Sequence, residues 1–215
     1  MAFFITIEGI EGCGKTTQAT LLADWLKSLG NQVLSTREPG GCPIADRIRS
    51  ILLDPSHTAM VSDAELLLYA AARAQHVAEI IRPALAAGVT VICDRFTDAT
   101  LAYQGYGRGL DRSKIGQLNE FASGALVPDL TLLVDYPAEE GLARARQRNL
   151  SQDNAAEGRF EDETLAFHQR VRDGYLAIAQ VNSRMVVLDG RGEIMAVHQR
   201  VVQATKAFLS RRLTP

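Results

Sequence analysis

Short apolar runs alternate with longer amphipathic segments along the chain. The runs are rich in β-branched and aromatic residues, and they predict five strands, at 3–8, 32–37, 89–94, 130–135 and 185–188. Apolar residues at three- and four-residue spacing predict helices, among them 44–53, 63–87 with a kink or break near Pro83, and 193–209. Strands separated by helices predict a parallel sheet with helices on both faces, which is an α/β fold.

The most polar stretch, 147–163, lies between two helical segments. A solvated loop and a mobile lid over a binding site both explain its composition. The chain shows no internal repeat, low-complexity tract or linker, so we expect one domain over residues 1–215.

Composition and charge narrow the class of protein. Of the 215 residues, 47% are apolar and 22% are charged, as in ordinary globular proteins. The 23 Lys and Arg and the 25 Asp and Glu nearly cancel, which argues against a nucleic-acid or membrane-surface protein. Cys13, Cys42 and Cys93 are too few and too scattered for a disulfide framework or a zinc site. Together with an N-terminal apolar run too short for a signal peptide, this predicts a cytoplasmic protein.

Residues 9–16 read GIEGCGKT and match the phosphate-binding pattern G-x-x-x-x-G-K-[ST]. They follow a predicted strand and open a predicted helix, so loop amides and the helix N-terminus converge on an anion. Lys15 supplies charge to the β- and γ-phosphates, and the Thr16 hydroxyl is a ligand for Mg²⁺. The residues expected to contact ATP are Gly9, Ile10, Glu11, Gly12, Cys13, Gly14, Lys15, Thr16 and Thr17. The motif predicts nucleoside triphosphate binding without naming the reaction.

The strand 89–94 ends at Asp94, and Arg95 follows directly; this pair favours a kinase among phosphate-loop proteins. The N-K-x-D motif expected of a GTPase is absent, and motor and transporter ATPases usually have Asp-Glu here. An Asp followed by an Arg suits a site where two phosphates meet, because the carboxylate holds Mg²⁺ or its waters while the guanidinium binds the second phosphate. The alternative is a structural ion pair on the surface.

Five segments carry a resemblance to a known family. They are GIEGCGKTT at 9–17, TREPGG at 36–41, AARAQH at 71–76, CDRFTDATLAYQGYGRGL at 93–110 and PDLTLLVD at 128–135. With these segments in this order and spacing, the chain resembles bacterial thymidylate kinases from end to end. The resemblance implies a P-loop kinase fold with a central five-stranded parallel sheet. It also implies transfer of the γ-phosphoryl group of ATP to dTMP, with Mg²⁺, by a homodimer.

The resemblance assigns residues to the dTMP side of the site. Arg73 and Arg95 hold the dTMP phosphate. Tyr69, one helical turn before Arg73, stacks on thymine, where the family more often has Phe. Core packing is the alternative for Tyr69. Thr100 and Gln104 contact the edge of the base.

Further positions come from the same comparison of motifs. Glu11 matches an acidic residue that binds the sugar 3′-hydroxyl close to the metal, with a solvated loop acid as the alternative. Tyr103 belongs to the substrate-binding set. Glu38 and Pro39 match another dTMP-side segment, in which proline fixes φ and the glycines that follow permit a close approach to the substrate.

Thymidylate kinases carry an extra catalytic arginine either in the phosphate loop or in the lid. Here the loop has small residues and no arginine, so we expect the lid, about 144–163, to supply the cations. The residues assigned to catalysis are Lys15, Arg95, Arg148 and Arg159. Arg146, together with or in place of Arg144, is expected to flank adenine by stacking. An insertion-like SQDNAAEG stretch and Gly158, where Asp is usual, leave the register of the lid open.

Cysteine and histidine add little to this picture. Cys13 replaces the alanine common in the family, and a tolerated small residue is the simple explanation. The alternative is a reactive thiol, with its pKa lowered by loop amides and Lys15. The four histidines, His57, His76, His168 and His198, lack the spacing of metal ligands and are interpreted as ordinary surface or core residues.

Two alternative functions remain open on the sequence alone. One is a kinase of the same fold that phosphorylates a deoxynucleoside or a different monophosphate. The other is an ATP-binding partner or regulatory protein without transferase activity. The DRF turn with Thr100 and Gln104 argues against the first, and the arginines of the dTMP side and the lid argue against the second.

Overall fold

The protein's structure is a computed structural model that describes residues 2–151 and 158–213. Its elements follow the chain as β1 (Phe4–Glu8), α1 (Lys15–Ser28), β2 (Val33–Arg37), α2 (Pro43–Leu53), α3 (Ser62–His76), η1 (Val77–Ile81), α4 (Arg82–Ala86), β3 (Thr90–Asp94), α5 (Thr97–Thr100), η2 (Leu101–Gly107), α6 (Arg112–Ser123), β4 (Leu130–Asp135), α7 (Ala138–Ser151), α8 (Leu165–Gln180), β5 (Met185–Asp189) and α9 (Ile194–Leu213). Two of them, η1 and η2, are π-helical segments. Strands alternate with helices, as the apolar pattern predicts.

The strands form one parallel sheet in the order β2-β3-β1-β4-β5, which confirms the predicted α/β fold. The central strands β1, β3 and β4 are almost entirely buried because helices cover both of their faces. The edge strands β2 and β5 are partly exposed. Ile7 pairs with Asp94, so β1 and β3 end at the same edge of the sheet. In such sheets, ligands bind at the carboxyl ends of neighbouring strands whose following segments run in opposite directions along the sheet. This is the case between β1 and each of its two neighbours, β3 and β4.

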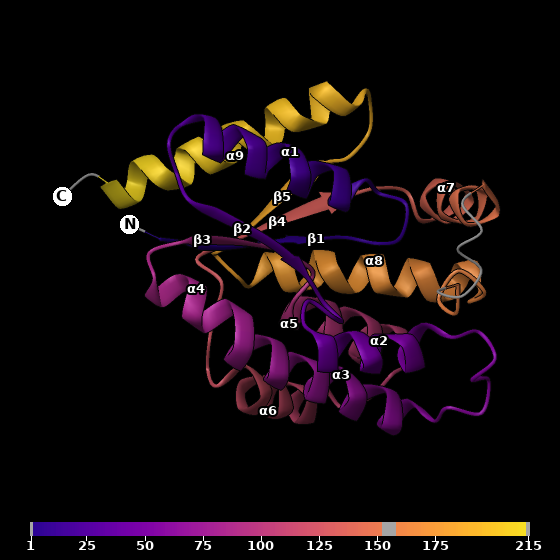
Figure 1. Ribbon diagram of the computed structural model, residues 1–215. Helices are drawn as coiled ribbons and strands as arrows, with labels where there is room; N and C mark the ends of the chain where they lie inside the picture. The colour runs from indigo at the N-terminus through magenta and orange to yellow at the C-terminus, as the bar shows by residue number, and fades with distance from the viewer. Residues whose placement is uncertain (1, 152–157, 214–215) are drawn as a thin grey trace.

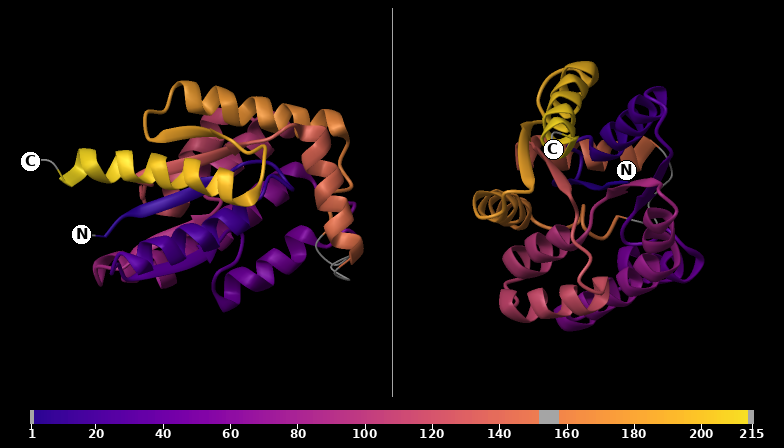
Figure 2. Two further views of the ribbon diagram at one scale, coloured as in Figure 1. Left: turned by 90° about the horizontal axis from the view of Figure 1, so that it is seen from above. Right: turned by 90° about the vertical axis from the view of Figure 1, so that its left-hand side faces the viewer.

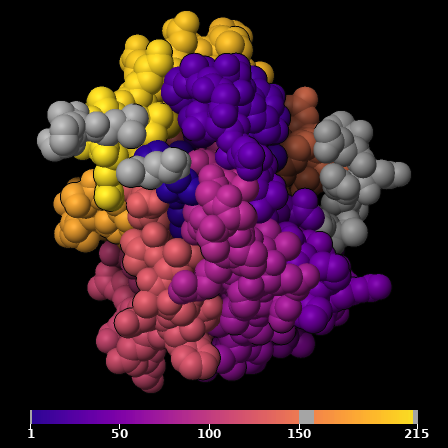
Figure 3. Space-filling view, turned by 60° about the vertical axis from the view of Figure 1, so that its left-hand side comes forward, coloured from indigo at the N-terminus to yellow at the C-terminus, as the bar shows by residue number. Residues whose placement is uncertain are grey.

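Helices form a layer on each face of the sheet. Figure 1 shows α1 and α9 above it, and α8, α5, α3 and α6 below it. The view on the right of Figure 2 shows the same two layers, and Figure 3 shows α1 and α9 side by side at the top of the molecule. α7 lies beyond the carboxyl end of β4, while both termini lie at the opposite end (Figure 1). Over the described residues, no helix combines the length and the apolar character needed to cross a membrane.

The predicted helix over 63–87 is divided into α3, η1 and α4. Pro83 lies at the start of α4, where it has no N–H to donate and its ring excludes the carbonyl of the preceding turn. The turn before it widens, and the Arg82 N–H donates to the carbonyl of Val77, five residues back. The predicted break is therefore confirmed, and the π-helical turn begins six residues ahead of the proline.

Candidate active site

The loop between β1 and α1 has the backbone shape needed to surround an anion. Several of its glycines have positive φ angles, 69° at Gly12 for example, which residues with a side chain rarely adopt. A Cβ at Gly12 would also overlap the carbonyl oxygen of Gly141 in α7. Lys15 opens α1, and its Nζ donates to the carbonyl oxygen of Ile10 at 2.9 Å. The ammonium group therefore folds back over the loop at the N-terminus of a 14-residue helix.

Thr16 and Asp94 bring two oxygen ligands together beside this loop. The Thr16 hydroxyl donates to Asp94 Oδ2 at 2.5 Å, which joins the first turn of α1 to the end of β3. Across residues 2–151 and 158–213, no group of three or more His, Cys, Asp or Glu could hold a metal ion. A hydroxyl and a carboxylate suit Mg²⁺, which takes few protein ligands and completes its shell with water and phosphate oxygens.

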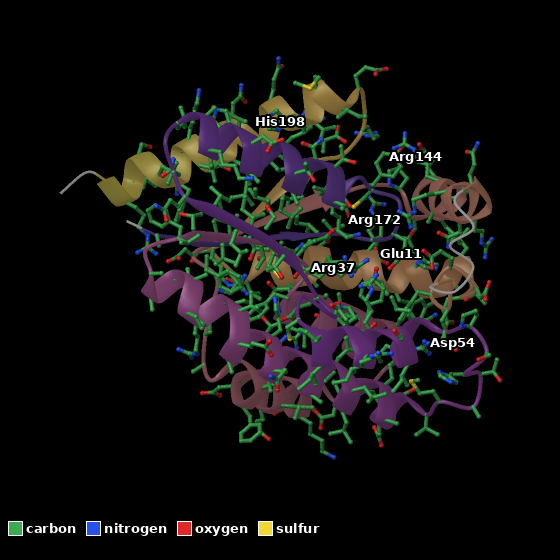
Figure 4. All side chains as sticks on the ribbon, in the orientation of Figure 1. Glu11, Arg37, Asp54, Arg144, Arg172 and His198 are labelled. Atoms are coloured by element: carbon green, nitrogen blue, oxygen red, sulfur yellow. The ribbon has the colours of Figure 1, made fainter. Side chains whose placement is uncertain are left out.

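A cavity of about 640 Å³ opens at the carboxyl ends of β1, β2 and β3, a size that suits a small-molecule ligand. The predicted residues that line it are Glu11, Gly12, Lys15, Thr16, Glu38, Pro39, Tyr69, Arg73, Asp94, Arg95, Thr100, Tyr103, Gln104 and Arg148. The predicted residues outside its lining are Gly9, Ile10, Cys13, Gly14, Thr17, Arg146 and Arg159. Two further cations line it, Arg37 and Arg49, which the sequence analysis did not select. Figure 4 shows Glu11 and Arg37 in the middle of the molecule, between the upper and lower helical layers.

Arg95 follows β3 and contacts the phosphate loop. Its φ of 72° is unusual for a residue with a side chain, and such strain is frequent at functional sites. Its NH2 donates to Glu11 Oε1 at 2.8 Å, so its ion pair is with Glu11 rather than with Asp94. The Tyr103 hydroxyl lies 2.7 and 2.6 Å from the two Glu11 oxygens. Burial raises the pKa of Glu11, but Arg95 and a hydrogen bond from His168 outweigh it, so the pKa lies well below its usual range.

Glu8, at the end of β1, supports Arg95 from behind the cavity wall. Its side chain is 0% exposed. Oε1 accepts from the Phe96 N–H at 2.7 Å, and Oε2 accepts from the Tyr175 hydroxyl at 2.8 Å. Arg95 NH1 donates to the same Tyr175 oxygen at 3.3 Å. Burial, followed by the charge of Asp98, raises the pKa of Glu8 to about 8. One buried acid thus fixes both the backbone after Arg95 and a side chain that Arg95 contacts.

Arg73, on α3, is only 1% exposed and is held by four hydrogen bonds. Its Nε donates to Glu38 Oε2 at 2.8 Å, and its NH1 donates to Asn119 Oδ1 at 2.8 Å. Its NH2 donates to the Phe96 carbonyl and to Thr100 Oγ1, both at 3.0 Å. Arg73 therefore lies at the same end of the cavity as Thr100.

Gln104, on η2, lies beside an acid that the sequence analysis did not select. Its Nε2 donates to Glu65 Oε1 at 2.8 Å. Glu65 is 1% exposed and also accepts from Arg108 and, at 2.5 Å, from Arg159. Burial raises the pKa of Glu65, but the hydrogen bonds from Arg108 and Gln104 and the two arginine charges outweigh it. The pKa is therefore lowered, and the buried carboxylate is ionised at neutral pH.

A family model described as thymidylate kinase matches residues 7–201. The chain belongs to the thymidylate kinase family. The thymidylate kinase of Syntrophotalea carbinolica is 59% identical over 211 residues, covering 98% of each chain. That of Geobacter sp. (strain M21) is 58% identical over 207 residues, which are 96% of this chain and 92% of the relative. A crystal structure of thymidylate kinase from Ehrlichia chaffeensis, 36% identical, matches with a TM-score of 0.76 over 95% of this chain and 98% of the other. The predicted resemblance and P-loop kinase fold are confirmed.

In this thymidylate kinase family member, the lid arginines take different positions. Arg148 lines the cavity from α7, and its NH2 lies 3.4 Å from Glu161 Oε1. Arg159 instead donates through Nε to the Leu52 carbonyl at 2.5 Å and through NH2 to Glu65. Arg146 donates to the Glu161 carbonyl at 2.9 Å.

The lid segment 158–163 is packed against the domain. Phe160 is 5% exposed, and its ring meets that of Tyr103 edge-on at 5.5 Å. A solvated loop is therefore not the right interpretation for Phe160 and Glu161, whereas Asp162 is exposed. Most of the SQDNAAEG stretch, residues 152–157, lies outside the described residues.

Cys13 does not have the environment of a reactive thiol. It is 3% exposed, and burial raises its pKa although Lys15 acts in the opposite direction. The hypothesis of a lowered thiol pKa is therefore wrong, because the side chain faces the apolar core rather than the anion-binding surface. The simpler explanation, a small residue that the turn tolerates, agrees with the structure.

Two of the histidines are buried, as core residues are, and contact side chains that line the cavity or hold the segment around Phe160. His76 is fully buried, with Nδ1 3.1 Å from Glu38 Oε1 and Nε2 2.7 Å from Thr36 Oγ1. His168 is buried with Nδ1 3.4 Å from Glu11 Oε2 and Nε2 3.0 Å from the carbonyl of Phe160, so it joins the phosphate loop to the lid. Neither has a spacing pattern in sequence that would have revealed these contacts.

Proposed function

We propose that this protein transfers the γ-phosphoryl group of ATP to dTMP, giving dTDP and ADP, by direct in-line transfer with Mg²⁺. Membership of the thymidylate kinase family supplies the reaction. The structural observation that carries the assignment is one cavity with the phosphate loop in one part of its wall and Arg73, Arg95 and Thr100 in another. Such a cavity can bring a triphosphate and a monophosphate together.

Charge neutralisation and positioning are the work expected of this site. The transferred group spreads negative charge over its oxygens, so fixed cations and amides lower the barrier. Lys15 and the amides of the phosphate loop serve the β- and γ-phosphates. Thr16 and Asp94 would hold Mg²⁺, which when bound neutralises charge on the β- and γ-phosphates. Arg95, at the end of β3 and against Glu11, serves the acceptor phosphate.

We assign the dTMP residues by their neighbours. Arg73 donates to Thr100, so both belong to the end that holds the base, together with Gln104 and Tyr69. The sequence-based assignment of Arg73 to the phosphate stays a prediction beside this one. Glu11 and Tyr103 form the sugar side, and Glu38 with Pro39 completes the wall behind Arg73.

The lid supplies the remaining positive charge in this proposal. Arg148 is the lid cation that lines the cavity, so we assign it to the transferred group, while Arg159 holds the lid segment through Glu65. Arg146 and Arg144 are assigned to the adenine side; Arg144 lies over the ring of Tyr136 at 4.4 Å. Closure of the lid would exclude water from ATP. A homodimer and a cytoplasmic location rest on the family resemblance and the composition.

A coupled ADP-release assay tests the proposal. It compares dTMP, dUMP, dCMP, dGMP and free thymidine as acceptors, with a Lys15→Ala variant and a blank without acceptor. Turnover on dTMP, less on dUMP and none on thymidine supports it. Faster turnover on thymidine would refute the assignment of Arg95 to the acceptor phosphate. ATP binding without turnover on any acceptor would favour a binding protein.

A further inference from the structure

The carboxamide of Gln104 can present either a donor or an acceptor to the cavity, and its neighbour decides which. Gln104 lines the cavity, and its Nε2 lies 2.8 Å from Glu65 Oε1. An ionised carboxylate only accepts hydrogen bonds, so the NH₂ group of the amide faces Glu65. With the NH₂ group engaged by Glu65, the amide oxygen is the polar atom of Gln104 left to accept a hydrogen bond from a ligand in the cavity.

Glu65 is held firmly enough to impose this orientation. Its Oε1 also accepts from Arg108 Nε at 3.2 Å. Its Oε2 accepts from Arg108 NH2 at 3.1 Å and from Arg159 NH2 at 2.5 Å. Both carboxylate oxygens are therefore in use, in a place almost free of solvent. Rotation of the carboxylate would take an ion-pair partner away from two largely buried guanidinium groups, those of Arg108 and Arg159.

We propose that Glu65 is a positioning residue that sets base specificity, because it fixes Gln104 with its amide oxygen toward the N3–H of the base. The proposal rests on the proposed function, which supplies dTMP as the acceptor. Thymine carries a donor at N3, and the amide oxygen accepts from it. Cytosine carries an acceptor at N3, so two acceptors would face each other and neither would be satisfied.

Thr100 presents the complementary group. Arg73 NH2 donates to Thr100 Oγ1 at 3.0 Å, which leaves the hydroxyl proton of Thr100 to donate to an acceptor in the cavity. The O4 of thymine is such an acceptor, whereas the 4-amino group of cytosine is a donor. Two buried charges, on Glu65 and Arg73, thus orient one acceptor and one donor at the base end. Uracil has the same donor at N3 and acceptor at O4 as thymine, and guanine has a donor at N1 and an acceptor at O6. Of these bases, cytosine alone reverses the pattern, so dCMP is the informative competitor.

The test is the ratio of kcat/KM for dTMP to kcat/KM for dCMP in Glu65→Gln. A glutamine at 65 can offer either its NH₂ group or its oxygen to Gln104, so the amide of Gln104 is free to turn. We expect the ratio to fall at least about tenfold, because turnover on dTMP falls while that on dCMP rises. KM for ATP should change less than about twofold, because the phosphate loop is untouched.

Two further variants separate specificity from folding. Glu163→Gln removes another ion-pair partner of Arg108 without touching the Gln104–Glu65 bond, so the ratio should stay within about twofold of the wild type. Glu65→Asp keeps the negative charge beside Arg108 and Arg159 and withdraws the carboxylate from Gln104. It is the variant to measure if Glu65→Gln does not fold, and its ratio should also fall.

The possible results lead to distinct conclusions. If the Glu65 variants lose kcat/KM equally for dTMP and dCMP, so that the ratio of the two values is unchanged, the proposal is overturned. Glu65 is then a structural residue. A fall of the same size in Glu163→Gln would also overturn it, since the effect would then come from the ion-pair cluster as a whole. Absence of turnover on dTMP in the wild type would refute the proposed function itself.

Discussion

We predict that replacing Glu8 with glutamine changes how the free energy of unfolding depends on pH. The sign and size of this change follow from the structure. Glu8 is completely buried between the Phe96 N–H and the Tyr175 hydroxyl. Burial, and then the charge of Asp98, raises its pKa to about 8 from an ordinary value of 4.5. Glutamine has nearly the same shape as the protonated acid and can bond to both partners. The variant therefore resembles the protein with Glu8 protonated at every pH.

The direction of the effect follows from where the proton is released. In the unfolded chain Glu8 loses its proton near pH 4.5, whereas in the folded protein it keeps the proton until about pH 8. Between these values unfolding releases a proton, so rising pH favours the unfolded state. The stabilising contribution is complete below pH 4.5 and is lost as the pH rises through 8. At about 1.4 kcal/mol for each tenfold change in proton concentration, the total is on the order of 5 kcal/mol.

The assay is urea unfolding of the wild type and Glu8→Gln at several values between about pH 5 and about pH 9. Other titrating groups contribute almost equally to both proteins, so the difference in free energy of unfolding isolates Glu8. Relative to the wild type, Glu8→Gln should gain stability as the pH rises to about 8 and should gain little above it. A difference that stays constant over this range would refute the reasoning, because it would mean that Glu8 titrates alike in the folded and unfolded states.

Three other predictions follow from the site. Gly12→Ala should weaken ATP binding at least about tenfold by calorimetry, because its backbone is left-handed and a Cβ would overlap the backbone of α7; unchanged affinity would contradict the loop geometry. Arg148→Ala should lower kcat by about a hundredfold with little change in the melting temperature, whereas Arg159→Ala, which breaks the ion pair with Glu65, should lower the melting temperature by several degrees. Identical behaviour of the two variants would refute that division. Iodoacetamide without ATP should leave activity intact, since Cys13 is buried with a raised pKa; rapid inactivation that Cys13→Ala abolishes would show otherwise.

Most of the fold could be predicted from the sequence, because the central strands are buried on both faces. Each of β1, β3 and β4 is a nearly continuous apolar run, which is a strong local signal. The π-helical turn at η1 could not be predicted, because the spacing of apolar residues barely differs between α- and π-helical turns. Only the proline downstream marked the region.

Residues of the site could be predicted from the sequence only where they belong to a local motif. The phosphate loop and Asp94 could be located because their chemistry requires fixed residues at fixed spacing. Glu8 and Glu65 could not, because their partners are distant in sequence. Glu8 meets Phe96 and Tyr175 across 88 and 167 residues, and Glu65 meets Gln104 across 39. An acid at the end of a strand or on a helix is common, and nothing nearby in the chain indicates that it is buried.

Buried acids explain how the cavity obtains groups of defined polarity. Glu65 and Glu8 lie behind the cavity wall, yet Glu65 orients the amide of Gln104, and Glu8 fixes the backbone and the tyrosine beside Arg95. Glu38 lines the cavity and holds Arg73 in the same way. The ionised carboxylate of Glu65 accepts hydrogen bonds and offers none, so it leaves the Gln104 amide one possible orientation. Glu8, whose pKa is raised to about 8, holds its two neighbours while it keeps its own proton. Substitutions of Glu65 and Glu8 should therefore change which base is accepted and how stability varies with pH, before they change the shape of the cavity.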